Sequence, residues 1–223
     1  MQEERARSRF AIDERRGQLV RVGLQEFSRR PYDAVSIDEI AAAAGVSKGL
    51  LYHYFSSKRD FYVAVIEAAA RELREVTEPE PELGEIERLR ASLDAYLAYV
   101  EQHAEAYVAL MRGGIGSDDE IRRIVDETRD VVMGRVFSHL SDNPTRPPAA
   151  FGGGPGEPSP LVRLTVRGWI GYVESASLDW LDRRDVSREE LRDLLVTSLV
   201  ILMGVAKDLA SRAGPVEGTA QAT

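Results

Sequence analysis

The chain has 223 residues, no cysteine and a net charge of −8 at neutral pH. This length suffices for one or two domains with a full core. The lack of cysteine excludes disulfides, thiolate metal ligands and a cysteine nucleophile. We find no signal peptide and no apolar run of the ~18 residues that span a bilayer. We therefore expect a cytoplasmic protein with no membrane partner.

Residues 1–12 are rich in arginine and lack apolar periodicity, so we expect a flexible basic arm. Such an arm can lie on phosphates or reach into a minor groove, and a solvated tail without a role is the alternative. Apolar residues at helical spacing then predict a first helix over about 13–29. Gly23 lies inside this helix, where glycine is unfavourable, and a close contact with another helix is the expected reason.

The stretch 36–54 predicts two short helices joined by a tight turn. Ser36 and Glu39 have the spacing of a capping box at the start of the first helix. Gly45 can adopt the left-handed conformation that ends this helix. Ser47 is the N-cap candidate of the second helix. Two short helices around a glycine-containing turn indicate a helix-turn-helix unit.

The second of these helices has side chains suited to DNA. A helix N-terminus with an ammonium beside it, as at Lys48, attracts phosphate. Gly49 would let the backbone lie close to DNA, and Leu50 could contact a thymine methyl group. An ordinary helical hairpin with aromatic packing is the alternative. The candidate DNA contacts are Ser36, Ser47, Lys48, Gly49, Leu50, Tyr52, His53 and Lys58, of which both lysines and Tyr52 are assigned to phosphate, and Leu50 and His53 to bases.

This part of the chain resembles the DNA-binding domain of the TetR family of bacterial transcriptional regulators. The residues that carry the resemblance are Ile40-Ala41, Ala44-Gly45-Val46-Ser47, Gly49, Leu51-Tyr52, Phe55 and Ser57-Lys58. It implies an all-α fold, in which an N-terminal three-helix helix-turn-helix DNA-binding domain (13–56) precedes a larger helical ligand-binding and dimerisation domain (83–212). Pro31 stands where the family usually has Gly, and proline cannot adopt the left-handed cap.

The charge distribution agrees with one end that faces DNA. Residues 1–60 hold eleven Lys or Arg and nine Asp or Glu, whereas the remaining residues hold 18 and 28. A mildly basic end on an acidic body suits a DNA-binding protein, although chance variation also produces so small an excess.

A fourth helix is expected over 57–76, with Ser57 as its cap, and in the resembling family this helix connects the two domains. The prolines of 78–81 predict a linker. Three helical segments follow up to about 140. Six of the ten prolines fall within 141–160, so we expect a disordered loop there. Residues 213–223 are expected to form a disordered tail.

Two long helices are predicted at about 161–184 and 187–211, and Ser187 with Glu190 forms a second capping box. The first of them is apolar almost all round, which predicts burial on all sides. The resemblance implies that both helices pack against a second subunit as a four-helix dimer interface. An intrachain core helix is the alternative.

The second domain is rich in aromatic, methionine and histidine side chains. Such side chains line small-molecule pockets, and the resemblance implies a pocket in this domain, but at helical spacing they also form ordinary core. The candidate ligand-binding residues are Tyr96, Tyr99, His103, Tyr107, Met111, Met133, Phe137, Trp169 and Tyr172. The three histidines lack metal-ligand spacing, and no catalytic or cofactor-binding motif occurs, so we expect no metal, no cofactor and no catalytic residue.

These observations together predict a homodimeric DNA-binding regulator. We expect a repressor that a small hydrophobic or amphipathic effector releases from a palindromic operator. The alternatives are a constitutive DNA binder without effector, and an enzyme with its active site in the helical domain.

Overall fold

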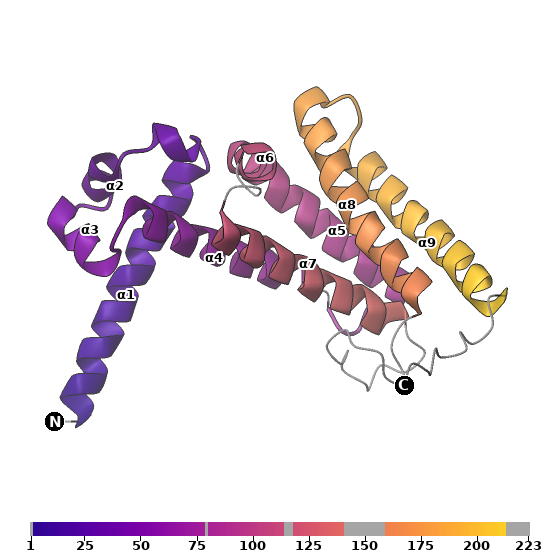
Figure 1. The fold of residues 1–223 in the computed structure, drawn as a ribbon, viewed down its shortest axis with the longest axis horizontal. Coiled ribbons are helices and arrows are strands. Elements are labelled where there is room, and N and C mark those ends of the chain that lie inside the picture. Colours follow the sequence, from indigo (N-terminus) through magenta and orange to yellow (C-terminus); the bar gives the residue numbers. More distant parts are fainter. Residues whose placement is uncertain (1, 79, 114–117, 141–158, 213–223) are drawn as a thin grey trace, which may run out of the picture. The chain divides into compact units, whose positions relative to one another are not determined.

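The computed structural model describes residues 2–78, 80–113, 118–140 and 159–212, which contain helices and no strand (Figure 1). Side chains are described from 14 to 137 and from 159 to 212 within these ranges. The predicted loop at 141–160, apart from its last two residues, and the predicted tail at 213–223 lie outside the described residues. The elements are α1 Gln2–Phe27, the 3₁₀ turn η1 Tyr32–Ala34, α2 Ile37–Ala43, α3 Lys48–Tyr54, α4 Lys58–Val76, α5 Glu85–Gln102, α6 Ala104–Gly113, α7 Asp119–Leu140, α8 Pro160–Arg183 and α9 Arg188–Arg212.

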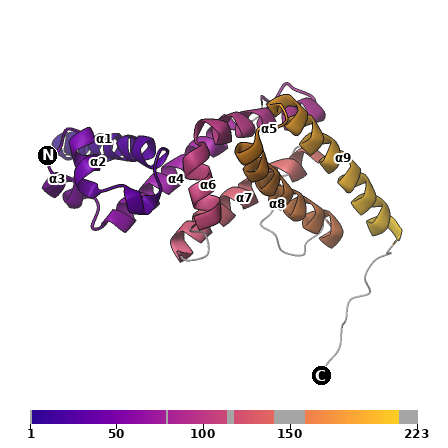
Figure 2. The same ribbon diagram turned by 90° about the horizontal axis from the view of Figure 1, so that it is seen from above.

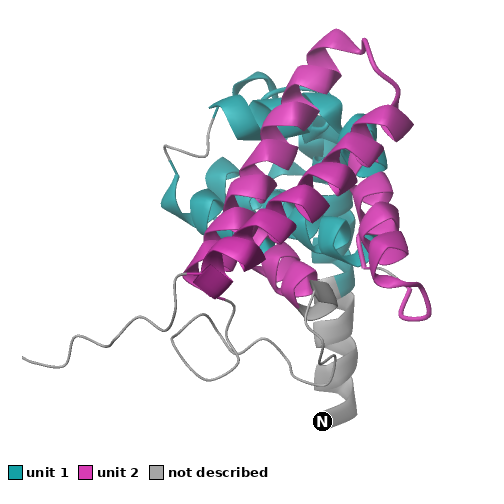
Figure 3. Ribbon diagram, turned by 90° about the vertical axis from the view of Figure 1, so that its right-hand side faces the viewer, with its two compact units in different colours: residues 1–76, 98–128 teal, residues 77–97, 129–223 magenta. Residues whose placement is uncertain are grey.

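The chain forms two compact units (Figure 3). Unit 1 comprises residues 1–76 and 98–128, and unit 2 comprises 77–97 and 129–223. The boundaries between the units therefore fall inside α5 and α7. These units are not the predicted domains, because residues 98–128 join the N-terminal part. The predicted functional division at the 78–81 segment stays a prediction.

Unit 1 is built on the contact of α1 with α4 and of α1 with α2 (Figure 1). Gly23 of α1 is buried against α4, where an added Cβ would lie 2.5 Å from Phe61 Cζ and 2.6 Å from Val65 Cγ2. The expected close helix contact at Gly23 is thus confirmed. The unit 1 core consists of Leu19, Val20, Phe27, Val35, Ile37, Ile40, Ala41, Leu51, Phe55, Phe61, Ala64 and Val65.

The first helix begins earlier than predicted. Residues 2–12, expected to form a flexible arm, are the first part of α1, so that prediction is wrong in its secondary structure. Gln, Glu, Arg and Ala are favourable helix formers. A sequence without apolar periodicity can still form a helix when its residues have high helix propensity. At its other end α1 stops at Phe27, and Pro31 caps the following 3₁₀ turn with φ −63°.

The predicted helix-turn-helix unit is confirmed in α2 and α3. Ser36 Oγ accepts from the Glu39 N–H at 3.1 Å, and Glu39 Oε2 accepts from the Ser36 N–H at 2.8 Å, which completes the capping box. Gly45 has φ +66°, the left-handed conformation that L side chains avoid. Ser47 Oγ accepts from the Leu50 N–H at 3.2 Å and caps α3.

Unit 2 is organised by α8 and α9, which lie side by side (Figures 1 and 2). Glu190 and Ser187 form the predicted capping box at the start of α9. Between the helices, the Trp180 indole N–H donates to the Val186 carbonyl at 2.9 Å. The unit 2 core consists of Leu93, Leu97, Met133, Val136, Phe137, Val166, Trp169, Ile170, Val173, Trp180, Leu191, Leu195, Val196, Leu199 and Met203.

A large apolar surface on α8 and α9 remains exposed. We name it the α8–α9 face, and its residues with their exposed fractions are Leu161 38%, Leu164 57%, Tyr172 39%, Leu194 54%, Val200 48%, Ile201 61%, Leu202 42%, Val205 52% and Leu209 48%. The expected burial of α8 on all sides is therefore wrong for the single chain. Gly168, Gly171 and Gly204 lie on the same two helices with no atom within 4 Å of an added Cβ, so these surfaces are open to close approach.

Among the described residues, α9 is the one helix long and apolar enough to cross a membrane by length and composition alone. The apolar part of this helix is 28% buried. The uncharged run of α9, 194–206, is shorter than the ~18 residues that span a bilayer, because Asp193 and Lys207 bound it. One side of α9 packs into the unit 2 core, where Leu191, Leu195, Leu199 and Met203 are buried, as in the core helix of a globular protein.

Candidate nucleic-acid interface

Helix α3 has one buried and one exposed side, as its sequence predicts. Leu51 is 0% exposed and Phe55, its C-cap, is 3% exposed, so these two side chains hold the helix on the unit 1 core. Leu50 is 37% exposed and Tyr52 is 41% exposed, and His53 is exposed as well. A helix of this size with a free outer side has the dimensions needed to enter a major groove.

The N-terminus of α3 carries an ion pair. Lys48 Nζ donates to Asp38 Oδ2 at 2.8 Å, and this hydrogen bond raises the pKa of Lys48. Both side chains are more than half exposed, so the pair contributes little to stability. The candidate phosphate contact at Lys48 thus has a protein partner in the free state, which a phosphate would have to replace.

Gly49 is not required by the packing of its own fold. An added Cβ would find only Ser47 Oγ, at 3.9 Å, which is an ordinary contact distance. The residue lies in the first turn of α3 and is exposed. Glycine in a helix costs about 0.5–1 kcal/mol relative to alanine, so this position favours an external reason for glycine, such as close approach of a partner.

Lys58 lies over an aromatic cluster and is half-buried. Its Nζ is 4.3 Å from the centre of the Tyr32 ring. The Tyr32 ring in turn packs on Tyr62 and Phe27, with centroid distances of 4.8 and 6.3 Å. The cation–π contact holds the first residue of α4 against η1. Ser36, the remaining DNA candidate, is exposed and already accepts one hydrogen bond within the α2 capping box.

Two charged residues beside α3 were missed at the sequence level. Arg16 places its guanidinium carbon 5.0 Å from the centre of the Phe55 ring, near the end of α3. Asp38 pairs with Lys48. Arg16 lies in the predicted first helix, and only knowledge of the α1–α3 packing would single it out. Asp38 resembles any acidic residue in a first helical turn, so no local signal marks it.

The ligand candidates divide between the two units. In unit 2, Met133, Phe137 and Trp169 belong to one buried cluster, and Tyr96 packs against it. The Trp169 indole N–H donates to the Leu195 carbonyl at 3.1 Å and to Ser198 Oγ at 3.2 Å, so its polar edge is satisfied within the core. Tyr172 is not brought to this cluster, because it lies on the exposed α8–α9 face.

In unit 1, the rings of Tyr99 and His103 lie 4.4 Å apart at the end of α5. The Tyr99 hydroxyl donates to the Ala69 carbonyl of α4 at 3.3 Å, and burial raises the pKa of Tyr99. Tyr107 and Met111 are half-buried on α6. The sequence placed all nine candidates in one domain, whereas five belong to unit 2 and these four to unit 1. Whether any of them binds a ligand stays a prediction.

Acidic and histidine side chains form no cluster that could hold a metal ion within the described part of the chain. The fold and the exposed side of α3 define the class of protein, a helix-turn-helix DNA-binding protein. Residues 19–65 match the family described as "Bacterial regulatory proteins, tetR family", and residues 86–202 match "Tetracyclin repressor-like, C-terminal domain". The chain belongs to the TetR family of transcriptional regulators, which are not enzymes.

Known relatives agree with this assignment. A tetR-family transcriptional regulator from Streptomyces coelicolor superposes with a TM-score of 0.79 and 36% identity, over 91% of this chain and 86% of that one. The HTH-type transcriptional activator FasR from Mycolicibacterium smegmatis is 31% identical over 142 residues, 60% of this chain. The match spans 62% of FasR, less than two thirds of its length. FadR from Bacillus subtilis, solved in complex with stearoyl-CoA, shares the fold with a TM-score of 0.62 at 16% identity, over 82% of this chain and 96% of FadR.

Proposed function

We propose that this regulator binds a palindromic operator as a homodimer in the cytoplasm, and that a small hydrophobic or amphipathic effector releases it. The observation that carries the DNA part is the exposed outer side of α3, with Leu50, Tyr52 and His53 above a buried inner side. Two copies related by a two-fold axis would read an inverted repeat. Its half-sites would lie about one helical turn, ~34–36 Å, or a multiple of it apart.

Selection from random DNA duplexes tests the operator, followed by footprinting of the enriched sequence. The expected result is an inverted repeat protected on both half-sites. Protection of one asymmetric half-site by a monomer would contradict the proposal. Leu50 and His53 are the proposed base contacts, so Leu50→Ala and His53→Ala proteins should enrich altered sequences, with losses of about 1–3 kcal/mol at the affected positions.

Gly49 offers a test that separates DNA binding from folding. The Gly49→Ala change should stabilise the protein by about 0.5–1 kcal/mol, because alanine favours the helix and an added Cβ meets no obstacle. It should nevertheless weaken operator binding if the backbone lies close to DNA. Urea unfolding and fluorescence anisotropy on the same preparation measure the two effects. Unchanged operator affinity would show that no close approach occurs at Gly49.

The direction of regulation is part of the proposal. Repression is favoured when the operator overlaps a promoter, because a dimer bound in the major groove excludes polymerase. FasR is named an activator, so activation is the alternative to repression. In vitro transcription from the selected operator's native promoter distinguishes the two. Fewer transcripts with added protein indicate a repressor, and more transcripts would overturn that part of the proposal.

The effector proposal rests on the aromatic and methionine side chains of α5 to α8. FadR was solved with stearoyl-CoA, an amphipathic molecule, which supports such an effector for this fold. If effector binding releases DNA, the two binding sites must be reciprocally coupled. The coupling free energy is typically ~1–3 kcal/mol. Thermal-shift screening with fatty acyl compounds should find a stabilising ligand. That ligand should bind the free protein more tightly than the operator complex, and equal affinities would refute the switch.

The alternative function is a constitutive DNA binder without effector. The satisfied indole of Trp169 and the burial of Met133 and Phe137 favour ordinary core at those positions. Failure of a broad ligand screen to stabilise the protein would support this alternative. It would leave the operator proposal intact.

A further inference from the structure

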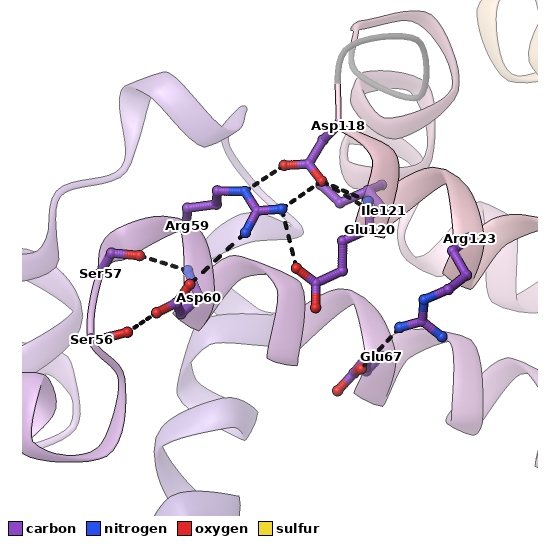
Figure 4. A network of polar contacts seen from close by, with 9 residues as sticks. All are labelled: Ser56, Ser57, Arg59, Asp60, Glu67, Asp118, Glu120, Ile121 and Arg123. Atoms are coloured by element: carbon purple, nitrogen blue, oxygen red, sulfur yellow. Dashed lines mark hydrogen bonds and ion pairs between the residues drawn. The ribbon is translucent and has the colours of Figure 1, made fainter.

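An ion pair joins the start of α4 to the start of α7 within unit 1 (Figure 4). Arg59 Nε donates to Asp118 Oδ2 at 2.7 Å, and Arg59 Nη2 donates to Asp118 Oδ1 at 2.9 Å. The same guanidinium lies 3.1 Å from Glu120 Oε2. Two parallel hydrogen bonds fix both the distance and the orientation of the partners. We name this contact the Arg59–Asp118 latch.

The Asp118 carboxylate has two roles at once (Figure 4). Its Oδ1 also accepts from the backbone N–H groups of Glu120 at 3.0 Å and Ile121 at 3.3 Å, which caps α7. The hydrogen bond from Arg59 holds the pKa of Asp118 below its usual range. The side chain of Asp118 is 20% exposed, whereas that of Arg59 is 48% exposed.

An apolar cluster lies along the same pair of helices. Val63 and Ile66 of α4 pack with Ile121 and Ile124 of α7, and all four are less than 9% exposed. The N-terminal parts of α4 and α7 are therefore held together by packing and by the latch. A change at the start of α7 has a direct structural path to the start of α4.

The start of α4 in turn determines where α3 lies. Only residues 55–57 separate Tyr54, the last residue of α3, from Lys58, the first of α4. Phe55 within this link is buried, and its ring contacts the Phe61 ring at 4.8 Å. Ser57 Oγ accepts from the Asp60 N–H at 3.0 Å and caps α4. Because the link is short and fixed at both ends, a shift of the first α4 turn must also shift α3.

We infer that Asp118 is a positioning residue for operator recognition, which sets the orientation of α3 through Arg59 without contacting DNA. The inference rests on the proposed operator binding. It assigns a function in DNA reading to a residue of the second family-matched region, more than 60 positions after α3. Specific binding requires a fixed orientation of α3, whereas attraction to phosphates does not. Loss of the latch should therefore affect specific binding alone.

The same contact could have the opposite effect, in which the ion pair with Asp118 prevents Arg59 from binding a DNA phosphate. Arg59 is 48% exposed, so it could reach a phosphate once released. Under that role, loss of Asp118 would tighten binding to every sequence alike and steepen the salt dependence. The two roles thus predict effects of different kind and sign.

The decisive variant is Asp118→Asn, because asparagine caps a helix as well as aspartate does but carries no charge for Arg59. The matched control is Asp119→Asn at the next position. It removes the same charge from a side chain that is 93% exposed and pairs with Arg122. Affinities are measured for the selected operator duplex and for a random-sequence duplex of equal length, at a temperature where every variant is fully folded.

The expected result is a loss of at least about fivefold in the ratio of operator to random-sequence affinity for Asp118→Asn, and no change for Asp119→Asn. Arg59→Gln should lower the ratio as well, and the double variant should lose no more than Asp118→Asn alone. An unchanged ratio in Asp118→Asn, or equal tightening on both duplexes, would overturn the inference.

Hydrogen exchange provides a readout that needs no DNA. Backbone amides of residues 58–63 should exchange faster in Asp118→Asn than in Asp119→Asn, because the first turn of α4 loses its support. If selection enriches no duplex, the proposed operator binding fails while the exchange comparison still decides whether the latch holds α4. Equal exchange in the two variants would refute the latch itself.

Discussion

At the scale of single residues, two glycines of α1 have opposite surroundings. Gly23 is buried where α1 meets α4, and a Cβ there would come within 3 Å of Phe61 and Val65. Gly17 lies earlier in the same helix, and the nearest atom to an added Cβ is Arg21 Nη1, at 3.7 Å. The helix backbone is the same at both sites, so any difference in the effect of substitution reports packing alone.

We predict that Gly23→Ala destabilises the protein by about 1–3 kcal/mol, because the extra methyl group forces α1 and α4 apart. Gly17→Ala is the matched control and should stabilise it by about 0.5–1 kcal/mol through helix propensity. Urea unfolding followed by circular dichroism measures both changes. Equal effects of the two substitutions would show that α1 and α4 do not pack as closely as their atoms indicate.

At the scale of elements, the short helix α2 depends on its N-terminal cap. Hydrogen bonds to Glu39 lower its pKa, chiefly the one from the Ser36 N–H and then the one from Arg30. A carboxyl whose pKa is lowered by folding stabilises the native state above its unfolded pKa. That contribution is lost as the pH falls through the lowered pKa of the folded state.

Replacing Glu39 by glutamine retains a capping-box acceptor and removes the charge. We predict that Glu39→Gln is less stable than the parent at neutral pH. The difference should shrink below the ordinary glutamate pKa of about 4.3 and vanish once Glu39 is protonated in the folded protein. Glu190→Gln, in the equivalent box of α9, should behave in the same way because the pKa of Glu190 is also lowered. Urea titrations at a series of pH values test this, and a difference that persists in acid would contradict the assignment.

At the scale of the whole molecule, the α8–α9 face calls for a partner. Apolar surface this extensive on two adjacent helices is typical of an interaction site. A second copy is the partner that the TetR-family assignment favours, and self-association through one shared face gives the two-fold symmetry that an inverted-repeat operator requires. The apolar composition of α9 follows from the same arrangement, since its two sides would face the core and the second subunit.

We predict that Ile201→Glu weakens dimerisation by more than about tenfold, because burial of an unpaired carboxylate costs more than about 1.4 kcal/mol. The matched control is Val131→Glu on α7, where the side chain is 40% exposed but lies outside the α8–α9 face. Sedimentation equilibrium measures both variants. A parent protein that stays monomeric in buffer and partitions into lipid vesicles would refute the dimer and support a membrane-bound α9.

The helix-turn-helix could be predicted because its determinants are local. Caps at Ser36 and Ser47, the turn at Gly45 and the alternation of Leu50 with Leu51 each depend on residues within a few positions. The contact at Gly23 could be predicted for a related reason, since glycine inside a helix is unfavourable and usually indicates close packing against another element.

The features that were missed depend on residues distant in sequence. The pairing of Asp118 with Arg59 joins residues 59 positions apart, so no local pattern marks it. The grouping of 98–128 with the N-terminal part likewise arises from tertiary packing of α4 with α7. Aromatic spacing in the second half could not tell which side chains meet in one cluster, such as Met133, Phe137 and Trp169, and which stay exposed, such as Tyr172.

Unit 1 is built from two separate segments of the chain, residues 1–76 and 98–128, so it cannot be completed until the second segment has been synthesised. Once residues 1–76 have left the ribosome, α1 to α4 can form, but Val63 and Ile66 of α4 still lack their packing partners Ile121 and Ile124. Native cover for that side of α4 arrives only when translation has passed residue 128. The nascent regulator therefore carries an exposed apolar strip during roughly 50 further elongation steps, or about 3–10 s at typical rates. A chaperone that binds short apolar helical segments would find its target in that interval.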